Sequence, residues 1–195
     1  MTDTNSPIHL HARAEGLWKR QLPDDLPSAW YAVADANVAQ SVCPHAATTR
    51  RAARWATALY RYEEFWRETG HTPRESTRNM ATLPDDERHQ GEWARYQRRF
   101  EEKLCLYQTI RLDISPAFEW DPHEHAWQTN FAACIQHVQT YGKLPHLNGA
   151  DKVEFALARW LGRQLRQQQR GAQPAGRAAQ LATLLTLQRL AVKTE

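Results

Sequence analysis

The stretch FEWDPHEHAWQTNFAACIQHVQTYGKLP, residues 118–145, decides the fold. Asp121 is followed by Pro122 and Glu124, which is the pattern of a helix start: a capping carboxylate, a proline at the first helical position and a glutamate two residues later. Gly142 supplies the left-handed residue with which many helices end. The stretch therefore predicts a helix that begins after Asp121 and ends before Gly142.

The rest of the chain shows the same helical organisation. The sequence of 195 residues has eight glycines, few β-branched residues and no sustained alternation of apolar and polar positions, so we expect no sheet and an all-α fold. Residues 1–12 have the composition of a disordered segment, and a weakly patterned helix is expected over 12–21. The remaining predicted helices cover about 28–40, 48–69, 85–103, 106–113, 121–141, 151–170 and 174–191.

The spacing of large apolar residues predicts which helix faces are buried. The face expected for 28–40 comprises Leu26, Trp30, Val33 and Val38. The face expected for 48–69 comprises Trp55, Leu59, Tyr62 and Trp66, and that for 85–103 comprises Trp93, Tyr96, Phe100 and Leu104.

The two halves of the chain contain an internal repeat. Pairs displaced by 72 residues are Trp55 and Trp127, Gly70 and Gly142, and Pro73 and Pro145. Pairs displaced by 67 residues are Trp93 and Trp160, and Gln97 and Gln164. The change of displacement falls in a polar loop over 71–84, where insertions are tolerated. We therefore expect an N-terminal segment over 1–47 and two repeats over 48–120 and 121–195.

In this order of tryptophan, glycine, proline, tryptophan and glutamine, the unit resembles the helicase-associated domain repeat. The resemblance covers about residues 50–190 and is best over 118–145, which looks like the junction of two consecutive repeats. It departs from the family pattern at Leu165, where an arginine usually follows the glutamine, and in the missing aromatic pair at the end of the second repeat. The resemblance implies tandem three-helix modules and nucleic-acid binding.

Composition and motifs exclude several other classes of protein. The N-terminal residues lack a basic and apolar leader, no apolar run approaches a membrane span, and the three cysteines have no CxxC spacing, so we expect a cytoplasmic protein without membrane contact. The chain has no GxxxxGK[ST] loop and no nucleophile motif, so we expect no enzyme activity and no cofactor. The pairs Cys43 with His45, His123 with His125, and Cys134 with His137 do not form a metal-ligand set.

Positive charge is concentrated at the C-terminal end. Residues 1–154 contain 18 Lys or Arg and 21 Asp or Glu, whereas residues 155–194 contain seven basic residues and no acidic one. Four of the seven are spaced by four, three and four residues, so they fall within about 60° of helical arc. These are Arg159, Arg163, Arg166 and Arg170. Gln164 and Gln167 lie between them.

Arginine and glutamine are residues that contact phosphates and purine edges, so the sequence predicts a DNA-binding face here. The equivalent face of the first repeat carries Arg95, Gln97, Arg98 and Arg99, with Glu92, Glu101 and Glu102 nearby to pair with them. A further basic cluster, formed by Arg50, Arg51 and Arg54, precedes Trp55.

Two functions remain open from the sequence alone. The first is a small DNA-binding protein, a regulator or accessory factor that binds duplex DNA through the basic second helices of its repeats. The second is a protein-interaction module, in which the same arginines bind an acidic partner. The four repeat-equivalent tryptophans are expected to pack in the core rather than to stack on bases.

Overall fold

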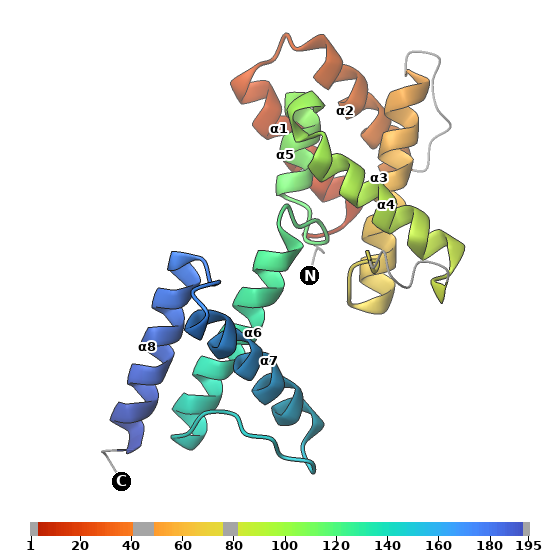
Figure 1. The fold of residues 1–195 in the computed structure, drawn as a ribbon. Coiled ribbons are helices and arrows are strands. Elements are labelled where there is room, and N and C mark those ends of the chain that lie inside the picture. The colour runs from red at the N-terminus through yellow and green to blue at the C-terminus, as the bar shows by residue number, and fades with distance from the viewer. Residues whose placement is uncertain (1–3, 41–48, 76–81, 193–195) are drawn as a thin grey trace. The chain divides into compact units, whose positions relative to one another are not determined.

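The computed structural model describes residues 4–40, 49–75 and 82–192, and the regular secondary structure of these residues is entirely helical (Figure 1). The predicted all-α fold is confirmed. The elements are α1 (Pro7–Gln21), α2 (Leu26–Ala39), α3 (Arg50–Thr69), α4 (Asp85–Arg99), the 3₁₀ turn η2 (Glu101–Lys103), α5 (Leu106–Asp113), α6 (Pro122–Tyr141), α7 (Lys152–Gln169) and α8 (Ala175–Val192). The predicted loop at 41–47 and part of the one at 71–84 lie outside the described residues.

The predicted helix ends are present. The Asp121 carboxylate accepts a hydrogen bond from the Glu124 backbone N–H at 2.9 Å, and α6 ends at Gly142 with φ of 69°. On α3, the Thr49 hydroxyl accepts from the Ala52 N–H at 3.2 Å, and Gly70 follows the helix with φ of 73°. These positive φ values are available to glycine at no steric cost, which explains why both helices end there.

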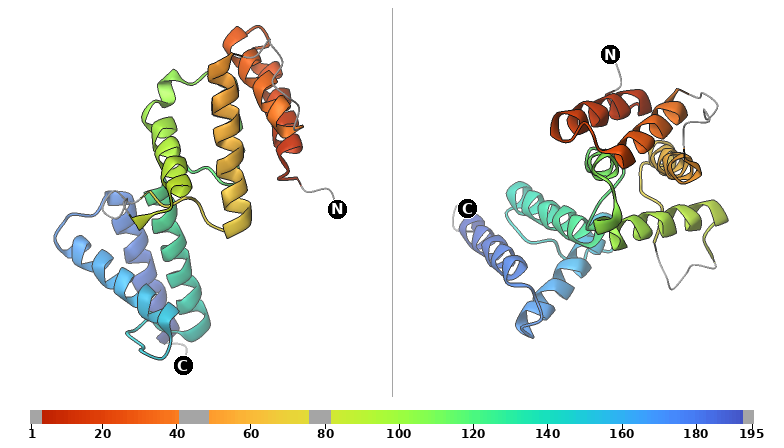
Figure 2. Two further views of the ribbon diagram at one scale, coloured as in Figure 1. Left: turned by 90° about the vertical axis from the view of Figure 1, so that its right-hand side faces the viewer. Right: turned by 90° about the horizontal axis from the view of Figure 1, so that it is seen from above.

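The N-terminal segment is more ordered than predicted. Helix α1 begins at Pro7, so the expectation of disorder is wrong for residues 7–12. Leu10, Ala14 and Trp18, spaced by four residues, are buried on one face of α1, which contacts α2 and α5. The two N-terminal helices lie next to each other in both views of Figure 2.

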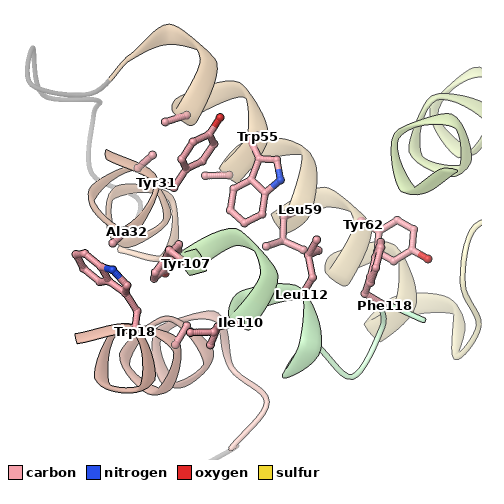
Figure 3. Packing of buried hydrophobic residues seen from close by; sticks show 14 of the residues in the cluster. Trp18, Tyr31, Ala32, Trp55, Leu59, Tyr62, Tyr107, Ile110, Leu112 and Phe118 are labelled. Carbon is pink, nitrogen blue, oxygen red and sulfur yellow. The ribbon is translucent and has the colours of Figure 1, made fainter. Parts of the chain in front are cut away.

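Helix α2 buries a different face from the predicted one. Leu26, Trp30 and Val33 are 59%, 39% and 44% exposed, and the buried residues are Ser28, Tyr31, Ala32, Ala34 and Asp35. Small side chains on this face let α2 approach α3 and α5 closely, and the one large residue, Tyr31, packs edge-on against Trp55 (Figure 3). The face that α2 buries is therefore determined by how closely it can pack against α3 and α5, and not by which positions carry the largest apolar side chains.

Helix α4 is shorter than predicted and is rotated relative to the expected face. It ends at Arg99, before the 3₁₀ turn η2. Ala94 and Gln97 are buried, Trp93 is partly buried and Tyr96 is 53% exposed.

The chain divides into two compact units, Met1–Trp120 and Asp121–Glu195. The core of the first unit is aromatic and includes Trp18, Tyr31, Trp55, Tyr62, Tyr107 and Phe118 (Figure 3). Helices α1 and α2 contribute to this core together with α3 and α5. In the second unit, α7 and α8 both pack against α6. The second core contains Trp127, Cys134, Val138, Trp160, Leu161, Leu181 and Leu184.

A buried ionic network connects α2, α3 and α5 in the first unit. The Arg111 side chain is 1% exposed and donates two hydrogen bonds to the Glu63 carboxylate, at 2.7 and 2.9 Å. Its Nε donates to Asp35 at 3.0 Å, and the Tyr107 hydroxyl donates to the same oxygen at 2.7 Å. Burial by itself raises the pKa of Asp35, but the charge of Arg111 and hydrogen bonds to the carboxylate outweigh it and lower that pKa.

Candidate nucleic-acid interface

The four arginines with helical spacing lie on the solvent side of α7 and its C-terminal cap, and we call them the α7 ridge: Arg159, Arg163, Arg166 and Arg170. Asp151 caps this helix by accepting hydrogen bonds from the backbone N–H groups of Val153 and Glu154, at 2.8 and 3.0 Å. Trp160 and Leu161 are 9% and 3% exposed and pack in the second core. All four arginines of the ridge are exposed. The helix is thus held by one face, and its arginines are displayed on another.

No carboxylate among the described residues forms an ion pair with an arginine of the ridge. The Arg159 guanidinium lies 6.0 Å from the centre of the Phe155 ring, which orients it without neutralising it. Arg166 is in the last turn of α7, and Arg170 is its C-terminal cap. Cations at this end interact favourably with the helix dipole, so the local structure tolerates the concentration of charge.

Gln164 does not belong to the exposed face, which contradicts its prediction as a DNA-contacting residue. It is 9% exposed, and its side-chain oxygen accepts hydrogen bonds from Trp127 Nε1 at 3.0 Å and from Gln173 Nε2 at 2.8 Å. Gln164 therefore satisfies a buried indole N–H inside the second unit. Gln167 is exposed and accepts a hydrogen bond from Gln173 at 3.2 Å.

Two of the predicted residues on α4 are also structural. Gln97 is 3% exposed and accepts a hydrogen bond from Trp55 Nε1 at 3.1 Å. The Arg98 side chain is 13% exposed, pairs with Glu75, and donates to the Glu119 carbonyl oxygen at 2.8 Å. The prediction that Gln97 and Arg98 contact DNA is contradicted, because their polar groups are already used within the first unit.

The other predicted basic residues of the first unit are more accessible. Arg99 is exposed, with its guanidinium 5.4 Å from the centre of the Phe100 ring, and Arg95 is half-buried on α4. Arg50 and Arg51 are exposed in the first turn of α3. The structure thus keeps these four residues at the surface of the first unit.

The tryptophan–glutamine hydrogen bond occurs once in each unit, at positions that the repeat makes equivalent. A second shared contact was missed by the sequence analysis. The buried Glu87 carboxylate accepts from the Arg74 backbone N–H at 2.9 Å, and the buried Glu154 carboxylate accepts from the His146 backbone N–H at 3.3 Å. Arg74 and His146 are displaced by 72 residues, and Glu87 and Glu154 by 67. Extending the two displacements to charged residues would have found this contact.

These two glutamates hold the segment that follows each proline. Hydrogen bonds from the side chain and backbone of Arg74 hold the pKa of Glu87 at about 2. A side-chain hydrogen bond from Asn148 at 3.0 Å lowers the pKa of Glu154. Both carboxylates are therefore charged at neutral pH and are occupied within the fold.

Gln164→Ala is expected to lower the free energy of unfolding by about 1 to 3 kcal/mol, because the Trp127 indole N–H is left buried without an acceptor. The matched control is Gln167→Ala, which removes an exposed side chain from the same helix and should change stability by less than about 0.5 kcal/mol. Urea unfolding followed by tryptophan fluorescence measures both. Equal stabilities for the two variants would show that the buried hydrogen bond contributes nothing.

Comparison of the chain with known protein families, with curated proteins and with solved structures found no match. Within the described part of the chain, every helix is too short or too polar to cross a membrane. The same residues contain no group of three or more His, Cys, Asp or Glu side chains placed to hold a metal ion.

Proposed function

We propose that this protein binds duplex DNA through the α7 ridge. The observation that carries the proposal is the display of four exposed arginines on one helix face with no carboxylate partner among the described residues. An α-helix fits the major groove, where arginine can contact phosphates and the O6 and N7 acceptors of guanine.

The dimensions of the ridge suit several phosphate contacts. Arg159 and Arg170 are eleven residues apart, which corresponds to about 16 Å along a helix. Each DNA strand carries a phosphate about every 3.4 Å, so this length spans several charges. Phosphate neutralisation would supply most of the affinity, and binding should therefore weaken steeply with salt.

The first unit has a secondary role in this proposal. Arg95 and Arg99 on α4 lie near the acidic residues Glu92, Glu101 and Glu102, which reduce the positive charge of that surface. We assign Arg95 and Arg99 to additional phosphate contacts.

We also propose that the two units derive from one repeated pattern, of the helicase-associated type. Support comes from the two contacts that recur at constant sequence displacement: the tryptophan–glutamine hydrogen bond and the glutamate that holds the post-proline backbone. A regulator or accessory factor that acts on DNA is the role that fits this organisation.

Arg163→Ala and Arg166→Ala are each expected to weaken duplex binding and to reduce the salt slope of log affinity by about 1, if each side chain touches one phosphate. Both side chains are exposed, so thermal stability should stay nearly unchanged. Fluorescence anisotropy with a labelled duplex across a salt series measures the slope. Arg189→Ala, which removes an exposed arginine from α8 of the same unit, is the control.

Two outcomes would contradict the duplex proposal. Wild-type affinity in both folded ridge variants would leave the ridge without a role in DNA binding. Absence of duplex binding by the wild-type protein even at low salt would favour the alternative, in which the ridge binds an acidic protein partner.

A further inference from the structure

A second basic surface lies in the first unit, between α3 and α4. Two adjoining cavities of about 500 and 390 Å³ follow these helices, and both are lined by Arg54 and Trp93. The larger is also lined by Arg50 and Arg61, and the smaller by Tyr96. We call these two cavities together the α3–α4 groove; the helices that form it are labelled in Figure 1.

The charge of the groove selects an anion. Its lining cations are Arg50, Arg51, Arg54, Arg61 and Lys103, and no carboxylate of the described residues lines either cavity. The next cavity along α3 is lined by Glu64, Glu68 and Asp86, so the positive surface ends near Arg61. Arg50 and Arg61 are about 16 Å apart along the helix. This distance spans several linked phosphates, whereas a single phosphate ion would occupy only a small part of it.

The groove also presents aromatic rings. Tyr96 is 53% exposed, and its ring centre lies 4.6 Å from that of Phe100, which lines the same cavity. Trp93 contacts Tyr62 and Phe118 in the core and borders both cavities. A positively charged groove with aromatic side chains along it is the arrangement that binds single strands, because unpaired bases can stack on the rings.

We propose that the α3–α4 groove binds single-stranded nucleic acid. Arg50, Arg54 and Arg61 contact the phosphates, and a base stacks on the exposed Tyr96 ring. Duplex DNA meets only the charges of this groove, because its bases are already stacked and paired. The site lies in the first unit and does not depend on the α7 ridge.

The test compares a labelled single-stranded oligodeoxyadenylate, an abasic strand of the same length and a duplex. Affinity is measured by fluorescence anisotropy across a salt series. Tyr96→Ala is expected to weaken binding of the oligodeoxyadenylate by about five- to one-hundred-fold, which corresponds to the loss of one stacked base, and to leave the abasic strand unaffected. Arg54→Ala should reduce the salt slope by about 0.7 on both strands.

Matched controls separate the groove from the rest of the surface. Arg67→Ala removes an exposed arginine of α3 outside both cavities, and Tyr141→Ala removes a tyrosine of the second unit that is 61% exposed. Neither should alter single-strand affinity. Arg163→Ala should weaken duplex binding alone, so failure of the groove proposal is distinguishable from failure of the ridge proposal.

The proposal is overturned if the wild-type protein binds no single strand at low salt, or if Tyr96→Ala and Arg54→Ala, both folded by circular dichroism, bind it like the wild type. Equal affinity for the abasic strand and the oligodeoxyadenylate would overturn it as well, since the aromatic rings would then contribute nothing.

Discussion

Arg111→Met is expected to lower the free energy of unfolding of the first unit by about 3 to 5 kcal/mol, the range for breaking a buried ion pair from one side. Methionine keeps an unbranched stem in place of the arginine stem but removes the guanidinium group. Glu63 and Asp35, which are 2% and 4% exposed, would then remain buried without their cation. Denaturant unfolding of the variant and wild type at neutral pH measures the difference. The control is Arg67→Met on the exposed surface of α3.

The pH dependence identifies the cause of that loss. Without Arg111, the burial of Asp35 raises the pKa of its carboxyl group in the folded state above the unfolded value. A carboxyl group whose pKa is raised in the folded state lowers the free energy of unfolding most when it is ionised. The difference in free energy of unfolding between wild type and Arg111→Met should therefore shrink as the pH falls from 7 toward about 4, the usual carboxyl range. A deficit that stays constant over this window would point to lost packing rather than to uncompensated charge.

Trp127→Ala is expected to destabilise the second unit by about 3 to 5 kcal/mol, the range for deleting a buried tryptophan side chain. The indole is 4% exposed, stacks on Phe131 at 5.2 Å between ring centres and contacts Trp160 at 5.7 Å. It also donates the hydrogen bond to Gln164. The substitution therefore creates a cavity and removes the ring contacts and the hydrogen bond at the same time.

Trp127→Phe separates these contributions, because it keeps an aromatic ring and removes only the indole N–H and part of the volume. We expect a loss between those of Gln164→Ala and Trp127→Ala. Hydrogen exchange should show that protection falls in α6, α7 and α8 and persists in α3 and α5, since the two units have separate cores. Unchanged protection in the second unit would show that Trp127 does not support its core.

Local signals in the sequence predicted much of the helical framework. Proline, capping carboxylates and glycine act within one helical turn, and they placed both ends of α6 and the end of α3 correctly. The α2 face was wrong because packing across helices favours Ser28 and Ala32, whose small side chains permit close approach, and because Asp35 has its partner Arg111 far along the chain. No periodicity within one helix contains that information.

The candidate interface likewise combines features that depend on one helix alone with features that depend on contacts between helices. The spacing of the α7 arginines along one helix was sufficient to predict a common exposed face. Gln97 and Gln164 were misassigned because each bonds to a tryptophan on another helix. The repeat already contained the signal, since a glutamine that recurs in register with a core tryptophan is as consistent with a shared internal contact as with a shared ligand.

The two cysteines in the described residues differ in the burial of their thiols. Cys134 lies in the core of the second unit, where burial raises the pKa of its thiol to about 12, and burial also raises the pKa of Cys105 in the first unit. Only the thiolate reacts with alkylating reagents, so the fully buried Cys134 is modified mainly when the second core opens, whereas Cys105 is partly exposed. The rate at which the Cys134 peptide gains mass therefore records how often the second core opens under native conditions.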